Sequence, residues 1–356
     1  MKPYNSRKLK SLFFLNTYIN KLNMSNNIEG QPLNELKKLY TGEELLNLNT
    51  EEIPCLVEPF FHQAGLVCLA GSSDTGKSTL LRQLAISIST GEESFLGFKT
   101  NIRFKSAIYV STEDLARETG HLLHKQTMKY KPEELNDIGF IFESENLVNN
   151  LEHQLQLKRA DLVIVDCFSD VFTGDIKDSP KIRSFLQPYQ NLAHRYDCLF
   201  LFLHHTSKKA LLSPPHKDNL LGGVGLEGKM RLVMELRTDL SDPSTKHLCL
   251  VKGNYLPSNH KQESYVLNFD ESQLLFTNTE ERTPFDLLVK KDDDSNFKDK
   301  FNKIIELKGQ GMSYEEIAKI MGVASKGTIT KWISKGKGYG WSTGMEDNEE
   351  LGQEVE

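Results

Sequence analysis

A glycine-rich segment between an apolar run and an amphipathic one constrains the fold most strongly. Residues 71–78, GSSDTGKS, match the pattern G-x4-G-K-[ST], directly after the run GLVCLA and directly before KSTLLRQLAISIS. Glycines let such a loop turn back so that successive backbone N–H groups face a phosphate, and the following helix adds its positive N-terminal end. The spacing predicts a loop that binds ATP. Its expected contacts are Gly71, Ser72, Ser73, Asp74, Thr75, Gly76, Lys77, Ser78 and Thr79.

Apolar runs of strand length alternate with amphipathic segments of helix length between Glu51 and Asn278. Strands that are covered on both faces have this continuous apolar pattern, and the alternation predicts right-handed crossovers and a mostly parallel sheet flanked by helices, an α/β fold. After about residue 230 the runs follow one another without helical segments, which predicts that the sheet ends in antiparallel strands. The four main runs are GLVCLA (65–70), SAIYV (106–110), DLVIVD (161–166) and CLFLFLH (198–204).

Four side chains are predicted to carry the chemistry at this loop. Lys77 is expected to reach the β- and γ-phosphates, and the Ser78 hydroxyl to ligate Mg²⁺. Asp166 ends the run DLVIVD, so it is expected at the same sheet edge, where it can hold Mg²⁺ through water; the alternative is a carboxylate that caps a strand or helix. Hydrolysis also needs a base. Glu113, in STED after SAIYV, is the candidate, and the alternative is an early residue of the next helix.

Composition limits the classes of protein that this chain can represent. The 356 residues suffice for two domains, and the formal net charge of −6 argues against coating of nucleic acid by the whole surface. The five cysteines show no CxxC spacing and mostly lie in apolar runs, which indicates buried thiols in a reducing cytoplasm. The basic N-terminus carries only the short apolar stretch SLFFL, too short for a signal sequence or a membrane span.

Residues 301–336 regain helical periodicity after the charge-rich stretch 289–300. Ser313 stands three residues before Glu316, which is the pattern of a capping box, and Gly322 suits a tight turn before a second helix that starts at Ser325. The segment resembles the helix-turn-helix modules of resolvases and regulators. Nine lysines against four acidic residues between Lys298 and Lys337 favour a surface that faces phosphates, and a helical hairpin for protein contacts is the alternative. The residues expected to contact duplex DNA are Ser325, Lys326, Thr328 and Lys331.

These patterns divide the chain into five parts. We expect an N-terminal arm that is partly disordered, an ATPase domain, a linker, a helix-turn-helix domain and a disordered acidic tail. Within the ATPase domain, the loop at 206–223 is expected to be mobile, because it contains two prolines, three lysines and two glycines. The expected bounds are 1–50 for the arm, 51–280 for the ATPase domain, 281–300 for the linker, 301–338 for the helix-turn-helix domain and 339–356 for the tail.

Taken together, these segments resemble the RecA-like P-loop ATPases, and within them the RepA-like branch related to hexameric replicative helicases of plasmids and mobile elements. The resemblance covers residues 53–278 and rests on the segment that runs into the loop, on AIYVSTED, on LVIVD and on LFLHHTSKK. It implies that Glu113 activates water, that Asp166 holds the metal, and that His205 senses the γ-phosphate. A histidine pair at a strand end is otherwise more often a surface turn.

One position departs from the pattern of these helicases. Their relatives carry a Lys-x-Arg pair on a late strand, and its arginine reaches the nucleotide of the neighbouring subunit. In LVKGNYLPSN the chain has Lys252 but Asn254 at the place of the arginine. An arginine finger can contribute several orders of magnitude to the rate, so its absence leaves hydrolysis assisted by a neighbouring subunit open. Lys229 and Arg231 are the candidates to replace it, beside Lys252.

The predicted function is that of an oligomeric, DNA-dependent ATPase, a replicative helicase or a relative, with ATP and Mg²⁺ as cofactors. We expect a homo-oligomer, such as a hexameric ring, that contacts single-stranded DNA through loops of the ATPase domain and duplex DNA through the C-terminal module. The alternative is an ATP-gated DNA-binding regulator that unwinds nothing. Phosphotransfer to a small molecule is less favoured, because no acceptor site is visible and the DNA module would have no role.

Overall fold

The computed structural model describes residues 39–48, 52–207, 210–290, 294–323, 325–338 and 340–341. It divides the chain into two compact units, up to Val289 and from Lys290 onward. Most of the N-terminal arm and of the acidic tail lies outside the described residues. Within the arm, the short helix α2 (Gly42–Leu46) is closed by a capping box between Thr41 and Glu44.

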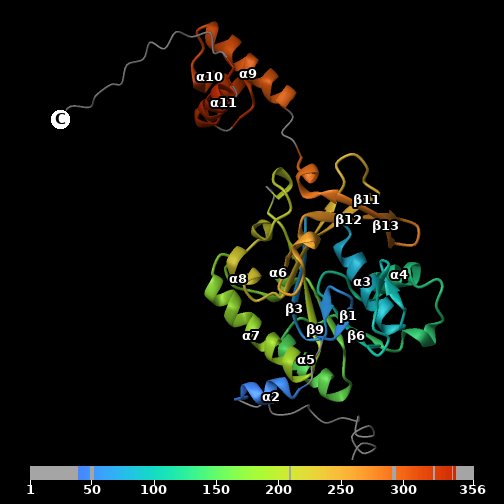
Figure 1. Cartoon of the computed structure of the whole chain (residues 1–356). Helices are drawn as coiled ribbons and strands as arrows, with labels where there is room; N and C mark the ends of the chain where they lie inside the picture. The colour runs from blue at the N-terminus through green and yellow to red at the C-terminus, as the bar shows by residue number, and fades with distance from the viewer. Residues whose placement is uncertain are drawn as a thin grey trace, which may run out of the picture. The chain divides into compact units, whose positions relative to one another are not determined.

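A nine-stranded sheet organises the first unit (Figure 1). Its pairings are parallel from β10 to β7 and antiparallel from β10 to β13, so the predicted change of strand direction is confirmed. In spatial order the strands are β13 (Leu275–Pro284), β12 (Glu263–Asp270), β11 (Thr245–Gly253), β10 (Leu232–Thr238), β3 (Gly65–Gly71), β9 (Leu199–His205), β8 (Leu162–Asp166), β6 (Ala107–Ser111) and β7 (Ile138–Ile141).

Helices cover both faces of this sheet, because alternate residues of each central strand point to opposite sides. In β9, Leu201 and Leu203 pack in the cluster that contains α3, whereas Phe200 and Phe202 pack in the cluster that contains α5 and α7. The longer helices of the unit are α3 (Lys77–Ser89), α4 (Ala116–Gln126), α5 (Leu147–Leu157) and α7 (Ser179–Arg195), and the shorter ones are α6 (Phe168–Val171) and α8 (Gly223–Glu227).

Several small elements of the first unit were not predicted. The edge strand β7 is only four residues long and contains a glycine, so its apolar signal is weak. Two antiparallel pairs also lie outside the main sheet: β1 (Cys55–Val57) with β2 (Phe61–His62), and β4 (Ser94–Phe95) with β5 (Phe98–Lys99). Five 3₁₀ turns complete the described part: η1 (Pro132–Leu135), η2 (Ala210–Leu212), η3 (Lys217–Asn219), η4 (Ser258–Lys261) and η5 (Phe285–Leu288).

The described part of the 206–223 loop is tied to the sheet, in contrast to the mobile loop that we expected. Thr206 bridges to Leu220, and a buried ion pair on β10 anchors the middle of the loop. In that pair, Arg237 donates to Glu235 and to the carbonyl oxygens of Ala210, Ser213 and Leu288. Arg237 and Glu235 are 2% and 1% exposed. The carbonyls that satisfy such a buried guanidinium come from distant segments, so local sequence does not reveal them.

The described part of the second unit contains three helices: α9 (Asp294–Gly309), α10 (Tyr314–Ile320) and α11 (Lys326–Gly338). The expected linker over 281–300 is therefore too long, since β13 and η5 extend to Leu288 and α9 begins at Asp294. Within that stretch Phe297 stands among charged residues, so the first turns of the helix show no apolar spacing, which begins only with Phe301 and Ile304. The capping box of Ser313 and Glu316 is present.

Candidate nucleotide site

The glycine-rich loop closes between β3 and α3, and its shape requires two of its glycines. Gly76 has a φ of +87°, and a Cβ there would lie 2.8 Å from Cζ of Phe276. A Cβ on Gly71 would lie 2.5 Å from the carbonyl oxygen of Leu236 on the neighbouring strand. Thr75 is buried and its hydroxyl donates to the carbonyl oxygen of Ser72 over 3.0 Å. The loop is thus held in a tight turn directly before a helix N-terminus, the arrangement that receives a phosphate.

The amine of Lys77 lies inside this loop. It donates to the carbonyl oxygen of Ser72 over 2.7 Å, and the residue is 6% exposed. Burial lowers the pKa of Lys77, while the negative charges of Asp166 and Glu113 oppose that shift. The single cation of the loop therefore faces both predicted carboxylates.

Asp166 ends β8 and is 6% exposed. Burial raises its pKa, and hydrogen bonds with Tyr109 and Ser78 oppose the shift. The Tyr109 hydroxyl donates to Oδ2 of Asp166 over 2.5 Å, whereas Oδ1 is buried without a hydrogen-bond partner among the described residues. An unpartnered buried oxygen is unfavourable, and a cation would relieve it. Carboxylate and hydroxyl oxygens are the ligands that Mg²⁺ prefers, so Asp166 and Ser78 fit that ion.

Glu113 lies on the chain between β6 and α4, close to Asp166. In the parallel register Ser111 is opposite Asp166, and the Thr112 N–H donates to the Asp166 carbonyl oxygen over 2.8 Å. Helix α4 begins only at Ala116, so Glu113 is not an early helical residue. The side chain is exposed, as a group that meets water at a strand end needs to be.

His205 ends β9, directly opposite Gly71 in the parallel register. It is half-buried, and burial together with the charge of Lys77 lowers its pKa. Its neighbour His204 is buried and has a different role, because its Nε2 lies 2.8 Å from the Leu221 carbonyl oxygen and so fastens the following loop. Burial lowers the pKa of His204 to about 4. The two adjacent histidines thus face different sides of the strand.

The candidates for a trans-acting cation lie elsewhere. Arg231 packs against Gly65, at the opposite end of β3 from the loop, since a Cβ on Gly65 would lie 2.8 Å from the Arg231 Cδ. Gly65 and Gly71, the two ends of β3, are six residue steps apart, which is about 20 Å at 3.3 Å per residue. Lys229 donates to Gln187 and Gln190, and Lys252 pairs with Glu227. None of the three reaches the loop of its own chain.

The four residues predicted to contact duplex DNA lie at the start of α11 in the second unit. Ser325, Lys326 and Lys331 are exposed, and Thr328 is partly buried. Lys326 forms an ion pair with Glu315 of α10 at 2.7 Å. The apolar side of α11 packs through Ile329, with Trp332 and Ile333 beside it. The polar side of the helix is therefore exposed, one of its lysines is paired, and contact with duplex DNA stays a prediction.

Two residues of the nucleotide site escaped the sequence analysis. Tyr109 lies in the middle of an apolar strand, where a tyrosine suggests only core packing, yet its hydroxyl contacts Asp166. Cys167 was interpreted as a buried thiol; it is 1% exposed, but its Sγ lies 3.8 Å from Oε1 of Glu113. Burial raises the pKa of this thiol to about 11. Only its position directly after Asp166 could have indicated that it belongs to the site.

Comparison with known proteins gives a family and a fold. Residues 32–210, half of the chain, match the family described as AAA domain. Among solved structures, one ATPase domain matches with a TM-score of 0.51 and 13% identity, over 67% of this chain and 96% of that one. A DnaB-like replicative helicase, solved in a study of its interactions with primase, matches with a TM-score of 0.52 and 12% identity, over 68% of each chain. Comparison with curated proteins finds no match.

The chain therefore belongs to the AAA-domain family. Its first unit has the fold of a RecA-like helicase ATPase domain, which confirms the predicted fold class of that unit. In the described part of the chain, no helix is long and apolar enough to cross a membrane.

Proposed function

We propose that this protein hydrolyses ATP at the carboxyl edge of its sheet and uses the energy to act on DNA as a helicase. The observation that carries the proposal is the convergence of Lys77, Ser78, Asp166, Glu113 and His205 from four neighbouring elements onto one loop. These are the parts that phosphoryl transfer needs: a cradle with a cation, metal ligands, and a group that orients water.

In this proposal each side chain has one role. The loop N–H groups and Lys77 bind the β- and γ-phosphates, and Ser78 and Asp166 hold Mg²⁺, which neutralises phosphate charge when bound. Tyr109 orients the Asp166 carboxylate through its hydrogen bond. Glu113 accepts a proton from the attacking water, and His205, one strand away, contacts the γ-phosphate.

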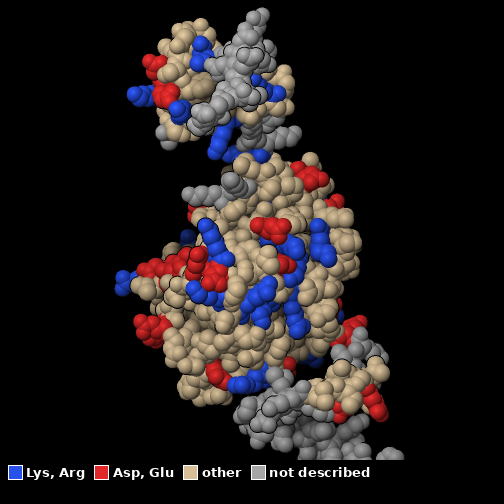
Figure 2. Space-filling view, turned by 90° about the vertical axis from the view of Figure 1, so that its left-hand side faces the viewer, with Lys and Arg blue, Asp and Glu red and all other residues tan. Residues whose placement is uncertain are grey.

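The position of Arg231 supports an oligomer. A side chain about 20 Å from its own loop can approach a γ-phosphate only in a neighbouring subunit. The Asn254 N–H donates to the Arg231 carbonyl oxygen over 3.0 Å, so Arg231 lies beside the position that carries arginine in related helicases. Figure 2 shows that lysine and arginine side chains gather on the α7–α8 side of the first unit. Basic residues of these elements and their neighbours include Arg183, Lys217, Lys229 and Lys252.

A mixing experiment tests the shared site. Lys77→Ala and Arg231→Ala should each abolish most turnover alone, because one loses the cradle and the other its trans-acting cation. An equimolar mixture should regain part of the activity, since some interfaces then pair an intact loop with an intact arginine. Activity of the mixture no higher than that of either variant would exclude Arg231 from this role, and Lys229→Ala and Lys252→Ala would be tested in the same way.

The helicase function is tested by DNA. ATP turnover should rise with single-stranded DNA, a forked duplex should be unwound, and native mass measured with ATP and DNA should show a closed oligomer, a hexamer in the simplest case. The C-terminal unit would bind duplex DNA through Ser325, Lys326, Thr328 and Lys331. The cytoplasm is the proposed location, because ATP and reduced thiols are found there.

A second function, an ATP-gated DNA-binding regulator, is favoured by one observation. Asn254 stands where related helicases have arginine, so subunits could assemble on ATP without fast turnover. In that case DNA would leave the rate of hydrolysis unchanged, no strand would be displaced, and footprinting would show protection of one duplex sequence.

A further inference from the structure

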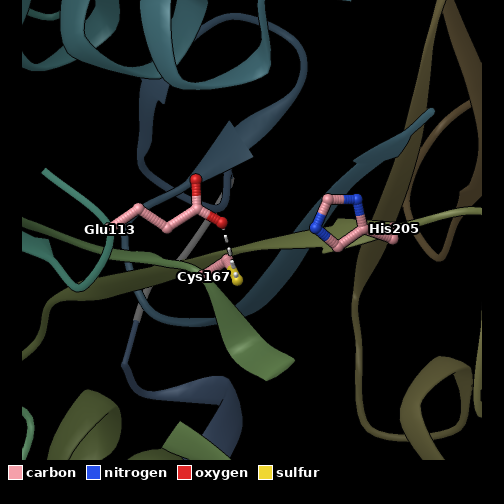
Figure 3. A group of neighbouring side chains, drawn as sticks. All are labelled: Glu113, Cys167 and His205. Carbon is pink, nitrogen blue, oxygen red and sulfur yellow. Dashed lines mark hydrogen bonds between the residues drawn. The ribbon is translucent and has the colours of Figure 1, made fainter. Parts of the chain in front are cut away.

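Three ligand-type side chains meet beside the proposed catalytic water (Figure 3). A carboxylate oxygen of Glu113, Sγ of Cys167 and a ring nitrogen of His205 all lie within 4.8 Å of one another. They follow or end three adjacent strands, β6, β8 and β9, so the parallel sheet itself brings them together. In Figure 3 the imidazole of His205 faces the Glu113–Cys167 pair across a small gap.

The donor set differs from that of the magnesium position. Mg²⁺ takes oxygen ligands, whereas a thiolate, an imidazole and one carboxylate together suit Zn²⁺ or a similar transition metal. Two ligands of a tetrahedral zinc ion, each about 2.0–2.3 Å from it, are roughly 3.5 Å apart. The three atoms would thus have to approach by about 1 Å, and Glu113 is exposed on a long side chain that allows this movement.

We propose that Glu113, Cys167 and His205 form a binding site for Zn²⁺ that is separate from the Asp166–Ser78 position. The ion takes Oε of Glu113, Sγ of Cys167 and a ring nitrogen of His205, and a water molecule completes the tetrahedron. Binding deprotonates the thiol and releases its proton to solvent. At present the Cys167 thiol has only weaker contacts, with Glu113 at 3.8 Å and with the Ser169 hydroxyl at 3.0 Å.

Occupation of this site would switch off hydrolysis. Zinc would occupy the carboxylate of Glu113 and the ring nitrogen of His205, so that neither could act on the attacking water or the γ-phosphate, while the phosphate loop and Asp166 stay available for nucleotide. This second part rests on the proposed function. The binding of metal does not depend on it and can be tested without nucleotide.

Cobalt(II) provides the direct test, because a thiolate bound to Co²⁺ gives an intense charge-transfer absorption in the near ultraviolet. The nucleotide-free, full-length protein is titrated with Co²⁺ in a buffer with a phosphine reductant, since thiol reductants would compete. We expect one equivalent to bind with this absorption, and Zn²⁺ to displace it. Cys167→Ser should abolish the absorption, and Glu113→Gln should weaken binding by about 10-fold or more.

The chain offers a matched control. Cys55 is half-buried and its Sγ lies 3.1 Å from Nδ1 of His62, so it is a second thiol beside a histidine, but no third ligand from the described residues joins it. Cys55→Ser should leave the cobalt absorption unchanged. If the absorption is missing in the native protein, or if it is lost in Cys55→Ser and kept in Cys167→Ser, the proposed site does not exist. Because Glu113 is exposed, Glu113→Gln should fold normally. Its effect on cobalt binding can therefore be measured even if Cys167→Ser fails to fold.

The inhibitory role is tested separately. Micromolar Zn²⁺ should stop ATP turnover in the presence of excess Mg²⁺ without preventing nucleotide binding, and a chelator should restore it. Cys167→Ser, compared with its own rate without zinc, should resist this inhibition. If cobalt binds but zinc does not inhibit, the metal site exists and the proposed regulatory role is wrong. If the protein binds cobalt but has no ATPase activity, only the proposed function is contradicted.

Discussion

Lys77 and Asp166 are both nearly buried at one edge of the sheet, where the charge of Asp166 opposes the lowering of the Lys77 pKa by burial. The lysine amine bonds to its own loop, and one oxygen of the carboxylate has no hydrogen-bond partner among the described residues. An ATP molecule with its metal would bring charge of the opposite sign to each of them. The site is therefore arranged for a ligand that carries both phosphate and a cation.

Lys77→Ala tests the cationic side of this arrangement. Removal of the amine should lower ATP turnover by roughly 100-fold or more, since one preorganised charged donor in an active site contributes on that scale. Nucleotide affinity, measured with a fluorescent ATP analogue, should fall with it. Wild-type turnover in this variant would show that the loop does not hold the phosphates.

Glu113→Gln separates binding from chemistry. The amide keeps the size of the side chain but accepts no proton, so turnover should fall by about 100-fold to 10,000-fold while ATP affinity stays near the wild-type value. Glu118→Gln is the matched control, because Glu118 is also exposed, five residues later in the first turn of α4. Equal ATP turnover in the two variants would show that the base is a residue other than Glu113.

At the scale of elements, the β3–loop–α3 unit depends on backbone geometry more than on side chains. Gly76 adopts a left-handed conformation that costs other residues about 1–2 kcal/mol, and its missing Cβ also makes room for the Phe276 ring. The loop that is proposed to bind the phosphates therefore also packs against the β12–β13 hairpin, through Phe276.

Gly76→Ala should lower the free energy of unfolding by about 1–2 kcal/mol and weaken ATP binding, as measured by thermal unfolding with and without nucleotide. Gly120→Ala serves as the control. Gly120 lies inside α4 with nothing within 4 Å of an added Cβ, so alanine there should stabilise the helix by about 0.5–1 kcal/mol. Similar effects of the two substitutions would mean that the loop tolerates a side chain.

The antiparallel half of the sheet is held by a polar chain that responds to pH. His247 of β11 lies 3.0 Å from the hydroxyl of Ser264 on β12 and 3.0 Å from the carboxylate of Asp239. Burial acts to raise the pKa of Asp239, but hydrogen bonds with His247 and Ser241 outweigh it and hold the pKa well below its ordinary value. A carboxylate with a lowered pKa stabilises the fold above the pKa it has in the unfolded chain, and this stability is lost as the pH falls.

Asp239→Asn should therefore destabilise the protein at neutral pH by about 1 kcal/mol, and the difference from wild type should shrink as the pH falls below about 4. Chemical unfolding at several pH values measures both effects. A difference that grows toward acid would contradict this account of Asp239.

For the whole molecule, the division into two units allows the two proposed activities, ATP hydrolysis and duplex binding, to be tested separately. Removal of residues 290–356 should leave ATP binding and turnover without DNA close to those of the full chain, because the site lies entirely before Val289. Duplex affinity should fall, since the lysine-rich helices are lost, and the loss should shrink at high salt. Unchanged duplex affinity in a truncated protein that melts cooperatively would assign DNA binding to the first unit.

The share of the structure that the sequence predicts differs from region to region, for physical reasons. The parallel strands were predictable because they are long apolar runs, whereas β7 and the β4–β5 pair are too short to give a periodic signal. The residues of α9 before Phe301 resemble a linker in sequence, because charged residues surround Phe297 and no apolar period is visible there. Glu113 could be selected as a candidate, but only the structure shows that it precedes α4 and adjoins Asp166.

By itself, the sequence determined the phosphate loop and the strand–loop–helix around it, because glycine spacing and apolar periodicity act over a few neighbouring residues. The strand ends in the sequence already predicted Glu113, Asp166 and His205 at one edge of the sheet, and tertiary structure decided which further side chains contact them. The contact of Tyr109 with Asp166, the placement of Arg231 at the far end of β3, and the meeting of Cys167 with Glu113 and His205 all follow from the register of parallel strands. The register pairs residues that are far apart in the sequence, so the pattern of a single strand does not reveal these contacts.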